Sequence, residues 1–305
     1  MHFGEAIEAE VGSTAVVGRI GGGSPSTATA MLPFAKVEWH HGANTLRYRL
    51  ATMTQDRVSR EDESEATSWL PAMALRDGSL AIEHGIHQEF GWERETDASG
   101  VAVLVYSDRV DNPVLEAFDH FAAAGSPAAV GMLFDPASSL LRAAGPSFSS
   151  AGVEASVARR LTSNNRIRVS YASGSALVMP ALPQATPLAD VLASAHPRRA
   201  QTYAISLSGT VDGTGTHWSA SYRWQPDSTV TEVAPFAEDA ALPFLNARLR
   251  QPIHVTRDGS GGLEALLEVR NLLAQGYRPY VLSDGSLLLF ADDQRSLRAG
   301  LAFTF

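Results

Sequence analysis

The feature that most constrains this chain is an alternation of apolar and polar residues, with a period of two, that recurs from end to end. Neighbouring side chains of a β-strand point to opposite faces, so this period predicts strands with one apolar and one polar face. In residues 33–41, for example, Val37 and Trp39 alternate with Glu38 and His40. Helical periodicity is scarce. The chain therefore predicts about twelve antiparallel strands.

The expected connections alternate between short turns and long loops. Short turns fall near residues 42–44, 96–100, 162–165, 211–216 and 256–262. Long connections fall near residues 12–31, 54–78, 108–151, 174–199, 226–244 and 274–294. Outer-membrane barrels have this arrangement, with short turns facing the periplasm, and an even strand number puts both chain ends on that side. The prediction is an all-β, transmembrane, antiparallel up-and-down barrel of about twelve strands, with short periplasmic turns and long extracellular loops. Residues 1–305 would form one domain or the C-terminal part of a larger barrel.

Composition excludes several other classes. The chain has 0 Cys, so disulfide frameworks and thiolate metal sites are excluded. A net charge of −9 without a clustered basic stripe argues against nucleic acid as a partner. No stretch reaches the roughly 18 apolar residues of a membrane-spanning helix. Residues 1–4 do not begin a signal peptide, so an exported chain would be a mature form or a fragment.

A soluble antiparallel protein would also alternate apolar and polar residues. Two features favour the membrane instead, with the apolar faces touching outer-membrane lipid. Charged residues lie in the middle of the polar faces, as a wet lumen allows. Aromatic residues lie near strand ends on the apolar face, as in interfacial girdles; these are Trp39, Trp92, Trp218, Trp224, Tyr171 and Tyr203.

The last segment, residues 295–305, carries an additional pattern. Arg298 is followed two residues later by Gly300, and then by Phe303 and the terminal Phe305. This resembles the β-signal that the barrel-assembly machinery reads in outer-membrane proteins. An exposed edge strand can be captured by strand pairing, and a terminal Phe places an aromatic ring at the membrane interface. The resemblance implies this machinery as a partner.

A longer segment, Leu263 to Phe305, resembles the two closing strands of TonB-dependent receptor barrels. An Asn271-Leu272 pair and Tyr277 follow the first strand, and the final strand contains Arg298. The resemblance covers about a seventh of the chain. That family has nearly twice as many strands, and neither its plug domain nor a TonB box is found here. Energy-coupled transport therefore does not follow from the resemblance.

The charges of the polar faces are the main functional candidates. We expect them to line the lumen, either as walls of an aqueous path or as ion pairs that fill a closed lumen. The candidates are Arg47, Arg49, Glu83, Glu89, Glu93, Arg166, Arg168, Arg223, Arg248, Arg250, Glu268 and Arg270. This predicts porin-like or receptor-like passage of a small solute. The alternatives are a plugged barrel whose loops bind partners, and, less favoured, a lipid-acting enzyme of the outer membrane.

No catalytic motif, cofactor site or metal site is expected. His40 and His41 are adjacent on one strand and point to opposite faces, and His84 and His87 differ by an odd step. The long connection 111–150 has helical spacing within 113–123. We expect this connection either to constrict the mouth of the barrel or to form a surface helix.

Overall fold

The computed structural model describes residues 2–3, 6–20, 26–53, 73–119, 131–135, 140–236, 241–253, 262–292 and 294–304. Most of these residues are in strands. Among them, no helix is both long and apolar enough to cross a membrane.

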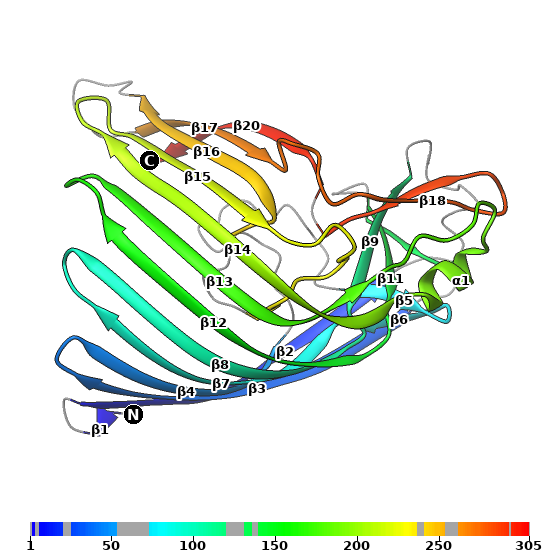
Figure 1. Ribbon diagram of the computed structural model, residues 1–305, viewed down its shortest axis with the longest axis horizontal. Coiled ribbons are helices and arrows are strands. Elements are labelled where there is room, and N and C mark those ends of the chain that lie inside the picture. Colours follow the sequence, from blue (N-terminus) through cyan, green and yellow to red (C-terminus); the bar gives the residue numbers. More distant parts are fainter. Residues whose placement is uncertain are drawn as a thin grey trace.

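One large antiparallel sheet of 13 strands dominates the structure (Figure 1). Apart from the short segments that leave it, each strand pairs with the next in chain order, as the sequence predicts for an up-and-down arrangement. Its first strand has only two residues, so the expectation of about twelve strands is confirmed. The strands are β1 (His2–Phe3), β2 (Ile7–Ile20), β3 (Ser26–His41), β4 (Asn44–Met53), β7 (His84–Glu95), β8 (Ser99–Asp111), β12 (Phe148–Arg160), β13 (Asn165–Val178), β14 (His196–Val211), β15 (Thr216–Trp224), β16 (Phe244–Ile253), β17 (Gly262–Arg270) and β20 (Ser296–Thr304).

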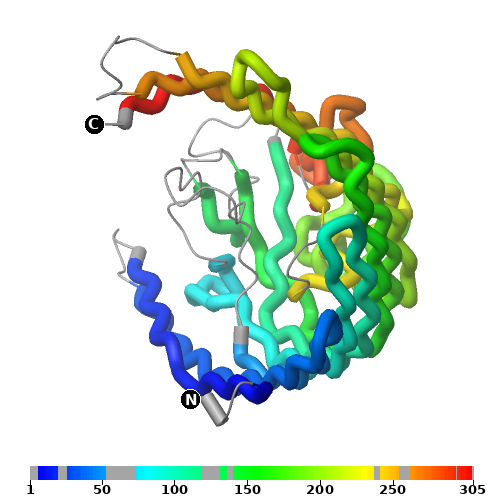
Figure 2. Tube along the Cα trace, turned by 90° about the vertical axis from the view of Figure 1, so that its left-hand side faces the viewer, coloured from blue at the N-terminus to red at the C-terminus, as the bar shows by residue number. Residues whose placement is uncertain are grey.

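A second sheet is built from the long connections of the first. Its path is β18-β19-β9-β11-β5-β6, and β10 also pairs with β11. In Figure 2 its green and cyan strands lie inside the curve of the large sheet. These strands are β5 (Met73–Arg76), β6 (Ser79–Ile82), β9 (Val114–Asp119), β10 (Leu133–Asp135), β11 (Leu140–Ala144), β18 (Arg278–Val281) and β19 (Leu287–Phe290), and a short helix, α1 (Leu188–Ala193), accompanies them.

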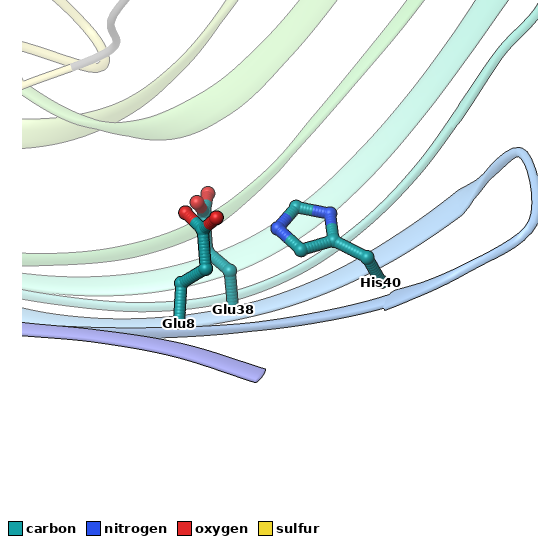
Figure 3. Close-up of side chains that lie close together, drawn as sticks. All are labelled: Glu8, Glu38 and His40. Carbon is teal, nitrogen blue, oxygen red and sulfur yellow. The ribbon is translucent and has the colours of Figure 1, made fainter. Parts of the chain in front are cut away.

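The two sides of the large sheet are defined by register. Figure 3 shows Glu8, Glu38 and His40 pointing from β2 and β3 into the space that the curved sheet surrounds, which we call the concave face. Register partners share a face. Glu38 is the partner of Arg47, which is the partner of Gly91, so the concave residues can be followed from strand to strand.

The opposite, convex face is apolar and exposed. Trp39 keeps 44% of its surface exposed, Trp224 46% and Leu301 64%, and no described residue forms a second layer over any of the three. The large exposed side chains on this face include Val11, Val17, Val37, Tyr48, Phe90, Trp92, Val103, Val105, Val157, Val169, Tyr203, Ile205, Leu249, Leu267, Leu297 and Phe303. A soluble sheet buries its apolar face against another layer. This sheet leaves it uncovered.

One row of register partners on the convex face contains five aromatic residues, and Trp218 lies outside it. It begins near the short-turn end of β3 and reaches the long-loop end of β15, so the strands are staggered as in a barrel with tilted strands. Near its far end the rings of Tyr171 and Tyr203 lie 5.2 Å apart, and those of Tyr203 and Trp224 lie 5.9 Å apart. The row is Trp39, Leu46, Trp92, Val103, Ala155, Tyr171, Tyr203 and Trp224.

The hydrophobic core lies at the long-loop end of the concave face. Its main cluster joins Val110 of β8 and Phe148 of β12 to residues of the second sheet, such as Leu141 and Phe290, and to Val191 of α1. A smaller cluster packs β5 and β6 against β2 and β3. The long connections thus supply the second layer that the concave face needs at this end.

Two expectations are corrected, and a third is met only in part. Closure of the predicted barrel is not detected among the described strands: β20 pairs only with β17, and beyond β1 and β3 no described strand pairs with β2. Figure 2 shows the gap between these two edges. The predicted long connection 12–31 is largely strand, because β2 continues to Ile20 and β3 begins at Ser26. The helical spacing of 113–123 is misleading as far as the structure describes it, to residue 119, since Val114–Asp119 is strand β9, in which Val114, Leu115, Glu116 and Ala117 are all buried.

Candidate functional site

The predicted lumen charges, except Glu83, lie on the concave face of the large sheet. Register links them across the strands: Arg166 is the partner of Ser208, Ser208 of Ser219, and Ser219 of Arg248. Arg248 is in turn the partner of Glu268. The concave residues are Arg47, Arg49, Glu89, Glu93, Arg166, Arg168, Arg223, Arg248, Arg250, Glu268 and Arg270.

Glu83 has a different position. It follows β6 and is 1% exposed, and its carboxylate oxygen accepts a hydrogen bond of 2.6 Å from the backbone N–H of Val114. This bond ties the start of β9 to the start of β7. Glu83 therefore connects the second sheet to the large sheet. Its prediction as a lumen-lining charge is not supported by this position. The alternation of apolar and polar residues in 80–93 is typical of a single strand, but the chain changes sheets at Glu83.

A chain of ionic contacts crosses β4, β7 and β8 on the concave face. Arg47 Nε lies 2.8 Å from one Glu89 oxygen, and the other Glu89 oxygen lies 2.8 Å from His87 Nε2. His87 Nδ1 lies 2.6 Å from Asp108. His87, Glu89 and Asp108 are all buried, so each charge depends on its neighbour for compensation. The sequence does not reveal this chain, because His87 meets Asp108 only through the register of two strands.

A segment between β15 and β16 folds back across the concave face. We call Gln225–Phe236 the inner strap. The Val230 N–H donates to the carbonyl of Leu177 at 2.9 Å, and the Tyr106 hydroxyl donates to the carbonyl of Val233 at 3.1 Å. The ring of Phe236 lies 5.7 Å from that of His87. The strap thus reaches from its own strands to β13, β8 and β7.

Two glycines make room for the inner strap. A Cβ at Gly85 would lie 2.5 Å from the Phe236 ring and 2.7 Å from a backbone oxygen. A Cβ at Gly174 would lie 2.2 Å from the Tyr106 hydroxyl and 2.8 Å from the carbonyl of Val233. These positions require a residue without a side chain, because the strap approaches the strands so closely. The long-loop end of the concave face is filled by this packing.

Arg223 anchors the start of the strap. Its Nη2 lies 3.5 Å from Asp292, and its Nη1 lies 3.7 Å from Glu232 within the strap. The side chain of Gln225 also donates to Asp292 at 3.2 Å. Arg223, Gln225 and Asp292 are buried. This predicted lumen arginine therefore connects β15 to the strap and to the segment that precedes β20.

An arginine-lined pocket lies at the other, short-turn end. It has a volume of about 570 Å³ and is open to the concave side. Its walls carry Arg160, Arg166, Arg248 and Arg250 together with His217, and the rest of its lining is mostly serine, threonine and asparagine. Three of these arginines are predicted site residues: Arg248 and Arg250 from β16, and Arg166 from β13. Arg160 was missed because it is the last residue of β12, beside the turn.

The N-terminal strands carry a mixed cluster of ligand-type groups, shown in Figure 3. Glu8 and Glu38 are direct register partners, and His40 follows Glu38 by two positions, so all three share the concave face. One ligand atom from each lies within 4.8 Å of the others. Lys36 Nζ lies 2.9 Å from Glu38 and competes with any cation. Sequence reasoning considered only pairs of histidines, and so missed a group drawn from two strands.

The closing strand places the predicted assembly residues at the edge of the sheet. Arg298 and Gly300 are concave, as partners of Glu268 and Leu266, whereas Phe303 is convex and exposed. Glu268 also bonds the Nε of Arg270 at 2.7 Å. Phe305 lies outside the described residues. β17 pairs with β20 along its whole length, as expected for successive strands of an up-and-down sheet, and this pairing does not show the resemblance to TonB-dependent receptors.

Three solved structures of toluene transporters match this chain at low identity. No family model matches the chain, and no curated protein matches it. Two structures of the toluene transporter TodX of Pseudomonas putida each match 97% of this chain at a TM-score of 0.30; one shares 8% identity over 87% of its own length, the other 7% over 88%. The toluene transporter TbuX of Ralstonia pickettii matches 98% of this chain and 86% of its own, with 11% identity and a TM-score of 0.32. Similarity this low says nothing about function.

Proposed function

We propose that this chain forms the wall of an outer-membrane β-barrel that lets small polar solutes pass. The observation that carries the proposal is the inverted distribution of side chains. Large apolar residues are exposed on the convex face, and charged residues occupy the concave face. Transmembrane barrels with a polar interior have this distribution, because lipid surrounds them and water fills them.

The orientation follows from the lengths of the connections. Short turns join β3 to β4, β7 to β8, β12 to β13 and β14 to β15 at one end, where β2 begins and β20 ends. In outer-membrane barrels such turns face the periplasm. The second sheet and the inner strap would then lie at the extracellular mouth. Assembly would use the edge strand β20, whose Arg298, Gly300 and Phe303 match the β-signal.

Residues of the second sheet and of the inner strap pack together at the long-loop end of the concave face. The inner strap, the second sheet and α1 share one hydrophobic cluster there, so solute passage requires the strap to move. The same packing favours a second candidate function, a permanently plugged barrel whose extracellular loops bind a partner. The two candidates differ in whether the strap ever leaves the concave face.

Reconstitution distinguishes these possibilities. The protein refolded into lipid vesicles should insert and should resist extraction with salt or carbonate. Single-channel conductance should be low for the parent chain and higher for Phe236→Ala, which removes the contact of the strap with His87 and Gly85. Tyr203→Ala, a convex-face truncation of similar size, is the matched control. Insertion without conductance in either variant would favour the plugged barrel. A chain that stays soluble and monomeric without detergent would refute the membrane location itself.

A further inference from the structure

The arginine-lined pocket is a separate feature of the concave face, and the proposal that small polar solutes pass does not explain it. Its floor is one row of register partners: Arg160 opposite Arg166, then Ser208, Ser219 and Arg248. Neighbouring strands are about 4.8 Å apart, so the two small serines separate the arginines at the two ends of the row. The hollow exists because these middle positions have short side chains.

The charge of the pocket is strongly positive. Arg160 and Arg166 stand directly opposite each other, which is a destabilising arrangement for like charges unless an anion lies between them. Among the described residues that line the pocket, none is acidic. Carboxylates from outside the lining lie beside its arginines, and Glu268 is the register partner of Arg248. Glu264 binds Arg250 through bonds of 3.1 and 2.6 Å, and Glu95 lies 3.6 Å from Arg166.

The remaining lining supplies neutral hydrogen-bonding groups. Ser208 and Ser219 offer hydroxyls, and the Thr210 hydroxyl is hydrogen-bonded to His217. Asn164 of the β12–β13 turn and Asn165 at the start of β13 offer amides, each of which already donates one hydrogen bond, to Asp212 and to Thr162. Guanidinium groups recognise phosphate and sulfate through paired, charge-assisted hydrogen bonds. Hydroxyls and amides suit the hydroxyl groups of a sugar or polyol. The volume of about 570 Å³ is in the range of small-molecule sites.

We propose that this pocket binds a hydroxylated anion, namely a phosphate or sulfate monoester of a small sugar or polyol. The guanidiniums of Arg166 and Arg248 hold the anionic group, and the serine floor and the two asparagines hold the hydroxyl groups. This ligand would be the solute of the proposed barrel, so its passage rests on the proposed function, whereas its binding to the pocket does not.

Isothermal titration of the full chain in detergent micelles tests the site without requiring conduction. Glucose 6-phosphate is the probe, glucose is the neutral comparison, and inorganic phosphate is the bare anion. We expect binding of glucose 6-phosphate, no measurable binding of glucose, and a dissociation constant for phosphate about 10-fold higher. Arg166→Gln combined with Arg248→Gln should weaken the binding of glucose 6-phosphate by about 30-fold or more.

Two further variants separate the pocket from general effects of charge and folding. Arg198→Gln combined with Arg199→Gln removes the same charge from exposed positions of β14 near its other end, and should leave binding unchanged. Ser208→Leu combined with Ser219→Leu fills the floor without changing charge, and should abolish binding. Equal losses in both arginine pairs, equal affinity for phosphate and its sugar ester, or no binding by the parent chain would each overturn the proposal. Binding by a chain that never enters a membrane would refute the proposed function and leave the pocket intact.

Discussion

Substitution of Val105 by arginine is the most direct test of which face meets lipid. Val105 lies in the middle of β8 on the convex face, with 53% of its surface exposed. Its register partners are Phe90 of β7 and Val153 of β12, so it is surrounded by apolar neighbours and no acidic partner stands opposite. The position would lie near the middle of the bilayer.

The two environments predict different magnitudes. In a transmembrane barrel, an arginine on the lipid face at the bilayer midplane costs about 2–4 kcal/mol. This corresponds to a roughly 30- to 800-fold fall in the folding equilibrium constant. On the exposed surface of a soluble protein, the same substitution changes the free energy of unfolding by only about 0.5 kcal/mol in either direction.

The assay is reversible unfolding in guanidinium chloride with the protein folded into lipid vesicles, followed by tryptophan fluorescence. The matched control is Ala172→Arg, which adds the same charge on the concave face, directly opposite Glu154. We expect a loss of about 2–4 kcal/mol for Val105→Arg and a change below about 1 kcal/mol for the control. Equal and small effects at both positions would refute the argument that the convex face contacts lipid.

Three further predictions follow from the contacts of the concave face and the closing strand. Asp108→Asn removes the carboxylate that pairs with buried His87 and should destabilise the folded protein by about 3–5 kcal/mol in the same unfolding assay, whereas loss of under 1 kcal/mol would contradict the ionic chain. Gly174→Ala should push the inner strap away from Tyr106, which limited proteolysis would detect as faster cleavage within residues 225–236; unchanged cleavage would show that the strap tolerates the methyl group. Phe303→Asp should reduce the amount of folded protein in cell outer membranes several-fold without preventing refolding into thin-bilayer vesicles, and equal loss in both measurements would assign Phe303 to stability alone.

The large sheet could be predicted because each of its strands carries its own signal. Alternation along residues 33–41 or 263–269 needs no knowledge of the partner strand, and the polar turns identify where each hairpin reverses. The second half of β2 was missed because its small residues, such as Gly12, Ser13 and Gly18, resemble a loop. They are strand because Gly12 and Gly18 admit Phe34 and Met73 against the backbone, which only the folded structure reveals.

The site was less predictable, for a physical reason. The alternation with period two places Arg166 and Arg248 on a polar face. That both line one pocket depends on the register of the two strands between them, which contribute Ser208 and Ser219. The inner strap gives no periodic signal at all. Its position depends on Tyr106 and Gly174, which belong to strands far away in the sequence.

Among the described strands, β20 and most of β2 have one edge without a partner strand, and this has a consequence for assembly. Each edge presents a line of backbone N–H and C=O groups, and in hydrocarbon every such group left without a partner costs several kcal/mol. An open wall of this kind cannot rest in a bilayer as an isolated sheet. Each edge can pair with the first compatible strand that it meets. Low protein concentration should therefore favour pairing of the two edges within one molecule, and high concentration should favour pairing between molecules.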